Sequence, residues 1–302
     1  MPDKSPHLTV RVVLGHAAKC LQPKRIVCDE DRNLGLLEAE LFLSHLLKKD
    51  RTWLRIHDSS RLSSTVSRLF SQMVARRMKH EPVAYILGTK EFYGLPFRVD
   101  KRVLIPRPES ELIVERVLEI LKRKPTTGDL AWDIGTGSGA IALAIAKEIA
   151  PRHVLASDIS MGAITVAKQN ARSLKIKNVS FIKANLLDAS ARRQLEKINP
   201  LRLVVTANLP YLPLSDKKKL DKDVVAFEPT NALFAKQNGL ELIEKLLRQL
   251  ASFDIHFDTL LLEYDPPQTK TLRALARSIF PKAKLTIHKD LAGRDRILKL
   301  TR

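Results

Sequence analysis

The chain has 302 residues, of which 44% are hydrophobic, and it carries a formal net charge of +19. This length suggests one large or two ordinary domains, with enough apolar material for a sizeable core. Its two cysteines, Cys20 and Cys28, form no CxxC pair, and its eight histidines have no metal-binding spacing, so we expect neither a disulfide framework nor a metal site.

The basic excess is spread along the chain and is denser toward the N-terminus. It favours a polyanionic partner, or a partner docked on RNA, as much as it favours a merely well-solvated basic surface. The first ten residues have no apolar signal core, and no run of 18 apolar residues occurs, so we expect a cytoplasmic protein without a membrane segment.

Helices are predicted over most of residues 8–80. Apolar positions recur at three- and four-residue spacing from Leu36 to Leu47 and again over Ser63–Lys79. The character changes near Glu81-Pro82, where Tyr85–Leu104 becomes strand-like around a Tyr93-Gly94 turn and predicts a β-hairpin.

A helix is expected next, from near Glu109 to just before Pro125, followed by alternating strands and helices. The predicted strands are Leu130–Ile134, His153–Ser157, Val179–Ala184, Leu201–Ala207 and Thr259–Tyr264, and the predicted helices are Ala140–Ile149, Met161–Ser173 and Leu240–Leu250. Such alternation implies a mostly parallel, doubly wound sheet. Two last alternating runs, Lys284–His288 and Arg296–Leu300, predict a terminal strand pair that adds an antiparallel edge.

A glycine-rich loop follows the first of these strands, with the sequence Asp133-Ile134-Gly135-Thr136-Gly137-Ser138-Gly139. Glycine lets the backbone turn tightly and approach a ligand, and open α/β sheets bind ligands at the carboxyl ends of their strands. Asp158 ends the next strand, where its carboxylate can accept hydrogen bonds from both hydroxyls of a ribose. Together these features predict an adenosine-containing cofactor.

The same loop also satisfies the dinucleotide fingerprint, so a nicotinamide cofactor is the alternative. The acid before the glycines, the Asn-x-Pro-Tyr sequence further along the sheet and the terminal strand pair favour S-adenosylmethionine. Asn185 and Leu186 end the third strand, where the adenine is expected, and Asn185 is either a contact to the base edge or an ordinary turn residue.

The tetrapeptide Asn208-Leu209-Pro210-Tyr211 follows the fourth strand. An amide nitrogen is a poor nucleophile because its lone pair is delocalised into the carbonyl. The side-chain oxygen of Asn208 and the carbonyl of Leu209 can accept its two N–H bonds, and the ring of Tyr211 can exclude water. Positioning by fixed dipoles would supply most of the rate, because the methylated nitrogen is acidic and loses its proton afterwards. The tetrapeptide is therefore a candidate methylation site.

Further motifs lie outside these two loops. They are Glu81–Gly88, Glu91–Gly94, Leu104–Glu111, Phe227–Leu233, Asn238–Leu240 and the segment Leu36–Trp53. With them the chain resembles, over nearly its whole length, the bacterial peptide-chain release factor glutamine N5-methyltransferases of the HemK/PrmC type.

The resemblance implies an α/β fold, the class I S-adenosylmethionine-dependent methyltransferase fold, with a Rossmann-like, mostly parallel seven-stranded sheet and an antiparallel C-terminal strand. It implies a helical substrate-docking domain over 1–82, a β-hairpin linker over 83–108 and a catalytic domain over 109–302. Residues of the 133–139 loop and Asp158 would bind S-adenosylmethionine. Asn208 and its neighbours would hold the glutamine of the Gly-Gly-Gln motif of class 1 release factors. We expect a monomer that meets nucleic acid indirectly, if at all.

Four positions depart from the family pattern. Leu209 stands where proline is usual, although its carbonyl survives and Pro210 still biases it toward extended backbone. Ser110 replaces threonine, Leu186 replaces an aromatic residue beside the adenine, and Tyr264 replaces an expected glycine. We predict a functional site with less rigidity and a lower cofactor affinity.

Three other functions are compatible with these features. Methylation of an adenine N6 amine uses a related tetrapeptide and would suit the basic charge, but the chain has no separate target-recognition region. Methylation of a glutamine in a ribosomal protein would need the same catalytic site. A non-catalytic RNA- or ribosome-binding protein would not need the intact glycine loop, Asp158 and Asn208.

Overall fold

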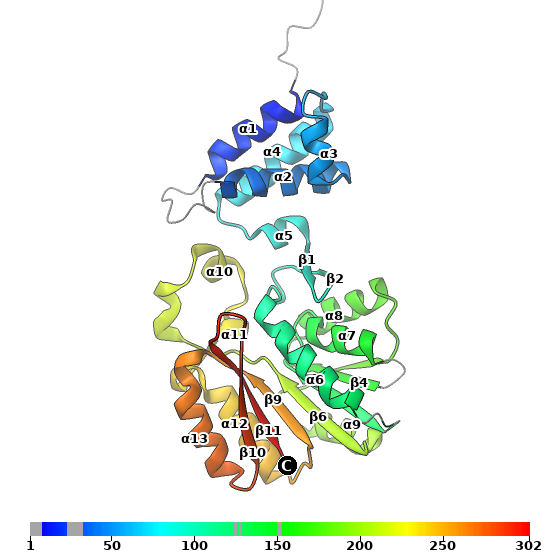
Figure 1. Ribbon diagram of the computed structural model, residues 1–302, viewed down its shortest axis with the longest axis vertical. Helices are drawn as coiled ribbons and strands as arrows, with labels where there is room; N and C mark the ends of the chain where they lie inside the picture. The colour runs from blue at the N-terminus through cyan, green and yellow to red at the C-terminus, as the bar shows by residue number, and fades with distance from the viewer. Residues whose placement is uncertain (1–7, 23–32, 124–125, 127, 150–152) are drawn as a thin grey trace, which may run out of the picture. The chain divides into compact units, whose positions relative to one another are not determined.

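A computed structural model describes residues 8–22, 33–123, 126, 128–149 and 153–302. These residues divide into two compact units (Figure 1). A helical unit takes the described residues up to Gly88 together with Lys222–Phe227, and a larger unit takes Thr89–Asp221 together with Glu228–Arg302. Cys28 and Pro125, which entered the predictions above, lie outside the described residues.

The helical unit contains the helices predicted over residues 8–80. They are α1 (Val10–Leu21), α2 (Leu34–Leu47), α3 (Arg51–Ile56) and α4 (Ser64–Met78), joined by α5 (Val83–Leu87) and α10 (Lys222–Phe227). Side chains of Thr9, Asp50 and Ser63 cap three of these helices by accepting a backbone N–H three residues later. Apolar side chains from α1, α2 and α4, among them Leu14, Phe42 and Phe70, form its core.

The predicted β-hairpin is present but shorter than expected. Strand β1 (Thr89–Phe92) pairs with β2 (Leu95–Arg98), and the turn residues Tyr93 and Gly94 both have positive φ. The prediction was wrong for Tyr85–Leu87, which belong to helix α5, and for residues 99–104, which form no strand. Pro82 before α5 and left-handed Gly88 after it are typical helix-boundary residues.

The larger unit is built on a seven-stranded sheet with the order β10-β11-β9-β6-β3-β4-β5. The strands are β3 (Asp129–Ile134), β4 (His153–Asp158), β5 (Val179–Lys183), β6 (Arg202–Ala207), β9 (Thr259–Glu263), β10 (Lys284–Lys289) and β11 (Asp295–Thr301). Neighbouring strands from β5 to β9 are parallel, and β11 is antiparallel to both β9 and β10. The predicted α/β fold and the antiparallel terminal strand are confirmed.

Helices cover both faces of this sheet (Figure 1). Leu130, Trp132 and Ile134 of β3 point into one apolar cluster, whereas Ala131 points into another, as the alternation of a strand requires. The first cluster includes residues of α9 (Ala189–Ile198), α12 (Glu241–Ser252) and α13 (Thr269–Ile279). The second includes residues of α6 (Glu111–Arg123), α7 (Ala140–Glu148) and α8 (Met161–Ser173). Helices α9 and α13 were not predicted.

Short elements complete the larger unit beside the strand ends. They are η2 (Pro108–Ser110), β7 (Leu212–Pro213), η3 (Leu214–Lys219), α11 (Thr230–Leu233), β8 (Phe234–Ala235), η4 (Gln237–Gly239) and η5 (Pro266–Gln268).

The strand order reverses direction between β3 and β6. The chain runs outward from β3 through β4 to β5 and then returns to β6 on the other side of β3. Ligands of open α/β sheets bind outside the carboxyl ends of the strands at such a switch point. Ile134 and Ala207 are partners in the β3–β6 register, so the loop that begins at Gly135 and the tetrapeptide that begins at Asn208 emerge side by side.

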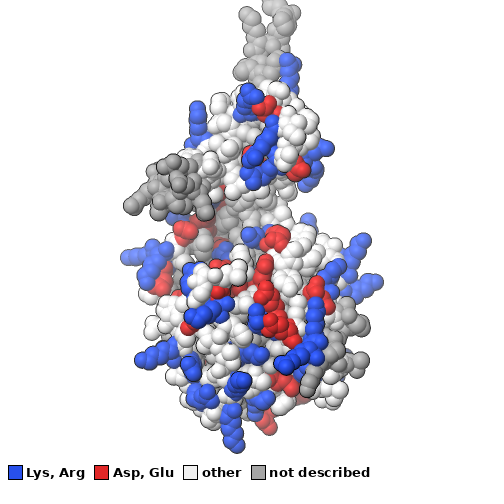
Figure 2. Space-filling model, in the orientation of Figure 1, with Lys and Arg blue, Asp and Glu red and all other residues white. Residues whose placement is uncertain are grey.

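Charged residues are distributed widely. Figure 2 shows Lys and Arg side chains spread over the visible face instead of gathering into one patch.

Within the part of the chain that the structure describes, no helix is long and apolar enough to cross a membrane. The same residues contain no group of three or more His, Cys, Asp and Glu side chains that could hold a metal ion.

Candidate active site

The glycine-rich loop between β3 and α7 turns through three left-handed residues. Gly135, Gly137 and Gly139 have φ values of 77°, 55° and 82°, a region that side-chain-bearing residues rarely adopt. The N–H groups of Gly135 and Thr136 donate to the carbonyl of Ser157 on β4, at 2.8 and 2.9 Å. The loop is therefore tied to the neighbouring strand, and its glycines leave the backbone open toward the strand ends.

Asp133 lies beneath this loop and does not line the pocket. Its carboxylate is 1% exposed and accepts hydrogen bonds from the hydroxyls of Thr136, at 2.7 Å, and Thr206, at 2.9 Å. Burial raises the pKa of Asp133 to about 6, against these two hydrogen bonds. Asp133 thus links the glycine-rich loop to β6, the strand that carries the tetrapeptide.

Asp158, at the end of β4, faces the pocket. One carboxylate oxygen accepts the N–H of Gly137 at 2.9 Å, and the other accepts the N–H of Ser160 at 2.8 Å. Burial raises the pKa of Asp158, and the two backbone donors oppose that shift. Since each carboxylate oxygen has a further lone pair, Asp158 can accept hydrogen bonds from two adjacent hydroxyl groups.

Asn185 and Leu186 line the same pocket, just beyond β5. The backbone N–H of Asn185 donates to Asp188 at 2.8 Å, and Asp188 also caps α9. Leu186 is buried and has a φ of 53°. The predicted adenine contacts therefore sit on a turn that is held by a helix cap.

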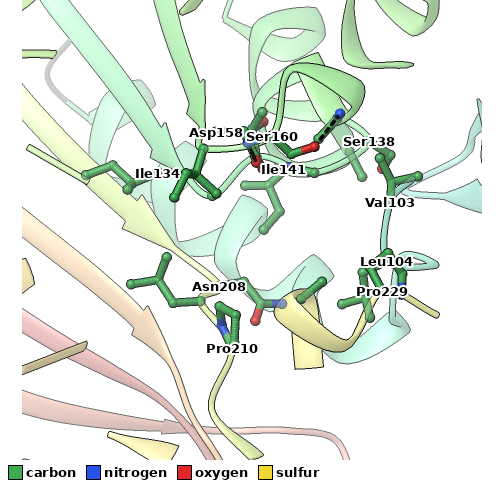
Figure 3. Close-up of a pocket in the computed structure, with 18 of the residues that line it drawn as sticks. Val103, Leu104, Ile134, Ser138, Ile141, Asp158, Ser160, Asn208, Pro210 and Pro229 are labelled. Carbon is green, nitrogen blue, oxygen red and sulfur yellow. Dashed lines mark hydrogen bonds between the residues drawn. The ribbon is translucent and has the colours of Figure 1, made fainter. Parts of the chain in front are cut away.

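The tetrapeptide lies on the opposite side of the pocket. Asn208 and Pro210 face Asp158 and Ser160 across it, and Val103, Leu104 and Pro229 lie along a third side (Figure 3). The side-chain nitrogen of Asn208 donates to the hydroxyl of Ser110 at 2.9 Å.

The other tetrapeptide residues take different environments. Leu209 lines the pocket but is only 4% exposed, and its side chain packs beside Gly135. Tyr211 is not among the pocket-lining residues, and its hydroxyl donates to Glu263 at 3.2 Å. Burial and the adjacent Glu263 carboxylate raise the pKa of Tyr211. The structure thus gathers Asn208, Leu209 and Pro210 at the pocket and turns the tyrosine away from it.

Several residues at the site were missed by sequence reasoning. Ser110 and Glu263 form a hydrogen-bonded chain behind Asn208. Glu228 fixes the segment of residues 103–107 along the pocket. Its carboxylate accepts the N–H of Ile105 at 3.1 Å and an N–H of the Arg107 guanidinium at 2.6 Å. Glu228 lies in the motif Phe227–Leu233 and Glu263 in the predicted strand Thr259–Tyr264, but neither pattern indicated which groups the carboxylates contact.

The pocket fits an adenosine-containing group. Its apolar walls include Ile134, Ile141, Ile159 and Leu186, and the Asp158 carboxylate supplies the paired acceptors that a ribose needs. A Cβ on Gly137 would meet no atom within 4 Å, so that side of the loop is open.

The fold and the site define the class of protein. A parallel sheet with a glycine loop after β3, an acid ending β4 and one antiparallel strand near the C-terminus is the class I methyltransferase architecture, and residues 128–253 match a family model described as a methyltransferase domain. Residues 13–88 match a model described as the PrmC N-terminal domain.

The chain belongs to the release factor glutamine methyltransferase family. It is 37% identical to the release factor glutamine methyltransferase of Coxiella burnetii, over 87% of this chain and 90% of the relative. It is 34% identical to that of Buchnera aphidicola subsp. Baizongia pistaciae, over 86% and 90%. The resemblance predicted from the motifs is therefore confirmed.

Among solved structures, the chain shares its fold with the catalytic domain of human METTL16, crystallised with MAT2A 3'UTR hairpin 1. The TM-score is 0.56 at 13% identity, over 86% of this chain and 90% of the other.

Proposed function

We propose that this protein transfers a methyl group from S-adenosylmethionine to the side-chain N5 of the glutamine in the Gly-Gly-Gln motif of class 1 release factors, a step that serves translation termination. The observation that carries this proposal is the position of Asn208 across the pocket from Asp158 (Figure 3). An amide-binding group and a ribose-binding group thus share one pocket. Family membership favours this substrate over a ribosomal protein or an adenine.

The cofactor would occupy the side of the pocket made by the glycine-rich loop. Asp158 would accept the ribose hydroxyls, the backbone of residues 135–139 would follow the amino-acid portion, and Asn185 and Leu186 would border the adenine. Asp133 would act indirectly, through its hydrogen bond to Thr136. When bound, S-adenosylmethionine supplies an electrophilic methyl group, and the acceptor nitrogen gains that methyl and loses one N–H proton.

The tetrapeptide would hold the acceptor amide. The side-chain oxygen of Asn208 and the carbonyl of Leu209 would each accept one N–H of the glutamine, which fixes the direction of the nitrogen lone pair. Neither group is a strong base, and none is needed, because the proton leaves after the nitrogen has been methylated. The rate advantage would come from positioning and from dipoles that are already oriented. Tyr211 would support the backbone of this site from behind.

The helical unit would dock the release factor. Its match to the PrmC N-terminal domain supports this role. The division of labour that we propose is a docking domain over 1–82, a hairpin linker over 83–108 and a catalytic domain over 109–302. The cytoplasm, where release factors act, is the location that this function implies.

Mass spectrometry tests the proposal. Purified class 1 release factor that lacks methylation is incubated with the enzyme and S-adenosylmethionine, and its peptides are then fragmented. We expect the Gly-Gly-Gln peptide to gain the mass of one CH₂ unit on the glutamine side chain. A release factor with that glutamine replaced by alanine should gain nothing. An unmodified wild-type peptide, or a methyl group on another residue, would overturn the assignment.

A further inference from the structure

One buried carboxylate holds both ends of the tetrapeptide. Glu263 is the last residue of β9 and is 1% exposed. One of its oxygens accepts the hydroxyl of Ser110 at 2.7 Å, and the other accepts the hydroxyl of Tyr211 at 3.2 Å. Ser110 in turn accepts the side-chain N–H of Asn208 at 2.9 Å. Asn208 is therefore held through Ser110, and Tyr211 is held directly.

Each hydrogen bond in the series from Asn208 through Ser110 to Glu263 has a defined donor and acceptor. A serine hydroxyl carries a single proton, and Ser110 donates that proton to Glu263. Toward Asn208 it can therefore offer only a lone pair, so the NH₂ end of the Asn208 amide must face Ser110. The carbonyl end of Asn208 is left to face the other way. A hydrogen bond from a hydroxyl to a carboxylate is stronger than one between neutral groups, which stabilises this arrangement.

Two hydroxyl groups donate to Glu263, one to each carboxylate oxygen. Burial raises its pKa, but the hydroxyls of Ser110 and Tyr211 and the charge of Arg296 favour the ionised carboxylate. Ser110 is itself only 3% exposed, so water does not compete for its hydroxyl. Were the Asn208 amide turned over, two N–H donors would face the substrate amide's own N–H groups, and no hydrogen bond could form.

We propose that Glu263 and Ser110 are positioning residues that fix the Asn208 amide with its carbonyl oxygen toward the acceptor amide. This inference rests on the proposed function, in which Asn208 accepts an N–H of the substrate glutamine. Glu263 does not line the pocket, and Ser110 lies at its wall with only 3% of its surface exposed, so we assign both an action through Asn208.

The first test measures single-turnover methylation of release factor by three full-length variants. Ser110→Ala removes the acceptor for Asn208. Glu263→Gln replaces the carboxylate with an amide, whose N–H can donate to Ser110. The serine proton is then free to be donated to the side-chain carbonyl of Asn208, which would turn the Asn208 amide over. We expect each to lower the rate by roughly 10–10², less than the roughly 10²–10³ lost with a preorganised contact to the reacting group itself, because these residues act through Asn208. Ser110→Thr keeps the hydroxyl and should restore most of the rate.

Matched controls separate positioning from damage to the fold. Asp129→Asn neutralises another buried carboxylate of the same sheet, one that is paired with Arg202 away from the pocket. Ser180→Ala deletes another hydrogen-bonded hydroxyl of the larger unit. Both should keep the wild-type rate per folded molecule. The dissociation constant for the cofactor, measured by calorimetry, should stay near the wild-type value in Ser110→Ala and Glu263→Gln.

A comparison of single and double variants tests whether Ser110 acts through Asn208. In an Asn208→Ala background, Ser110→Ala should have no further effect on the rate, because its only route to the substrate has been removed. An additional loss of the same size as in the wild-type background would overturn the proposal. A cofactor affinity that falls in parallel with the rate would overturn it as well.

A second readout needs no substrate. In nuclear magnetic resonance spectra of the full chain, the side-chain NH₂ of Asn208 should exchange slowly with water, and Ser110→Ala should accelerate that exchange. Equal exchange in both proteins would overturn the proposal. If wild-type enzyme methylated no release factor while the Asn208 signals behaved as expected, the proposed function would fail and the orientation of Asn208 would stand.

Discussion

Gly239 lies directly against the carbonyl of Tyr211, so closely that a Cβ on Gly239 would come within 1.8 Å of the Tyr211 oxygen. The same oxygen accepts the side-chain N–H of Gln268 at 2.7 Å, and a second bond of 2.8 Å ties Gln268 to the carbonyl of Asn238. The end of the tetrapeptide is thus clamped between a glycine without a side chain and a glutamine amide.

The first prediction follows from this contact. Gly239→Ala should lower the free energy of unfolding by more than about 3 kcal/mol, because the residue has positive φ and the new methyl group must displace the Tyr211 carbonyl. Gly94→Ala is the matched control, since Gly94 also has positive φ but would place its Cβ in open space. That variant should lose only about 1 kcal/mol. Urea denaturation of both proteins checks the difference, and equal losses would contradict it.

Much of the sheet and the cofactor loop could be predicted from the chain. Strands such as Leu130–Ile134 are apolar at every position but Asp133, because both faces of a parallel strand are buried. The glycines at 135, 137 and 139 mark backbone that only glycine adopts readily. The switch point between β3 and β6 then brings the loop and the tetrapeptide together, so their adjacency followed from the order of elements alone.

The hydrogen-bonded support of the site could not be predicted in the same way. Ser110 and Glu263 are 153 residues apart, and Asn208 and Ser110 are 98 apart. No periodicity connects such positions, because the contact depends on which side chains meet when the sheet is covered by its helices. Tyr211 was expected to exclude water from the substrate amide. Its position in the motif gave no indication that its hydroxyl donates to Glu263.

The errors in the predicted secondary structure have local causes. The apolar residues Ile86 and Leu87 resemble the start of a strand, yet they pack on the helical core as part of the short helix between Pro82 and Gly88. Helix α9 fully buries only Ala191, and its other residues are half-buried or exposed, so its apolar signal was weak.

The second prediction concerns the departure at Leu209. Leu209→Pro should keep turnover within the same order of magnitude as the wild type, because the carbonyl proposed to accept the substrate N–H is retained. It should lower the free energy of unfolding by roughly 1–2 kcal/mol, since it removes part of a buried side chain that packs beside Gly135. Urea denaturation and single-turnover rates check these outcomes. A large loss of turnover at unchanged stability would show that the leucine backbone itself is required.

The third prediction concerns Asp158. Asp158→Asn should weaken S-adenosylmethionine binding by roughly 10–10², because a charge-assisted acceptor for the ribose hydroxyls is lost. Asp290→Asn is a matched control, since Asp290 also accepts two backbone N–H groups, from Ala292 and Arg294, but does not line the pocket. Calorimetry with the cofactor should give a wild-type affinity for the control. Equal affinities in the two variants would remove Asp158 from the cofactor site.

The fourth prediction concerns the pH dependence of stability at Asp133. Its pKa rises from 3.8 to about 6 on folding, so the folded state binds the proton more tightly than the unfolded state. Well below pH 3.8 the carboxyl is protonated in both states and has no effect. As pH rises from about 4 to 6, the unfolded state ionises first, and stability falls by on the order of 3 kcal/mol, beyond which the loss is constant. Asp133→Asn keeps an acceptor for one of the two threonine hydroxyls and lacks this titration. The free energy of unfolding of Asp133→Asn relative to the wild type should therefore increase between pH 4 and pH 7, as measured by urea denaturation. A difference that does not vary with pH would mean that Asp133 titrates alike in the folded and unfolded states.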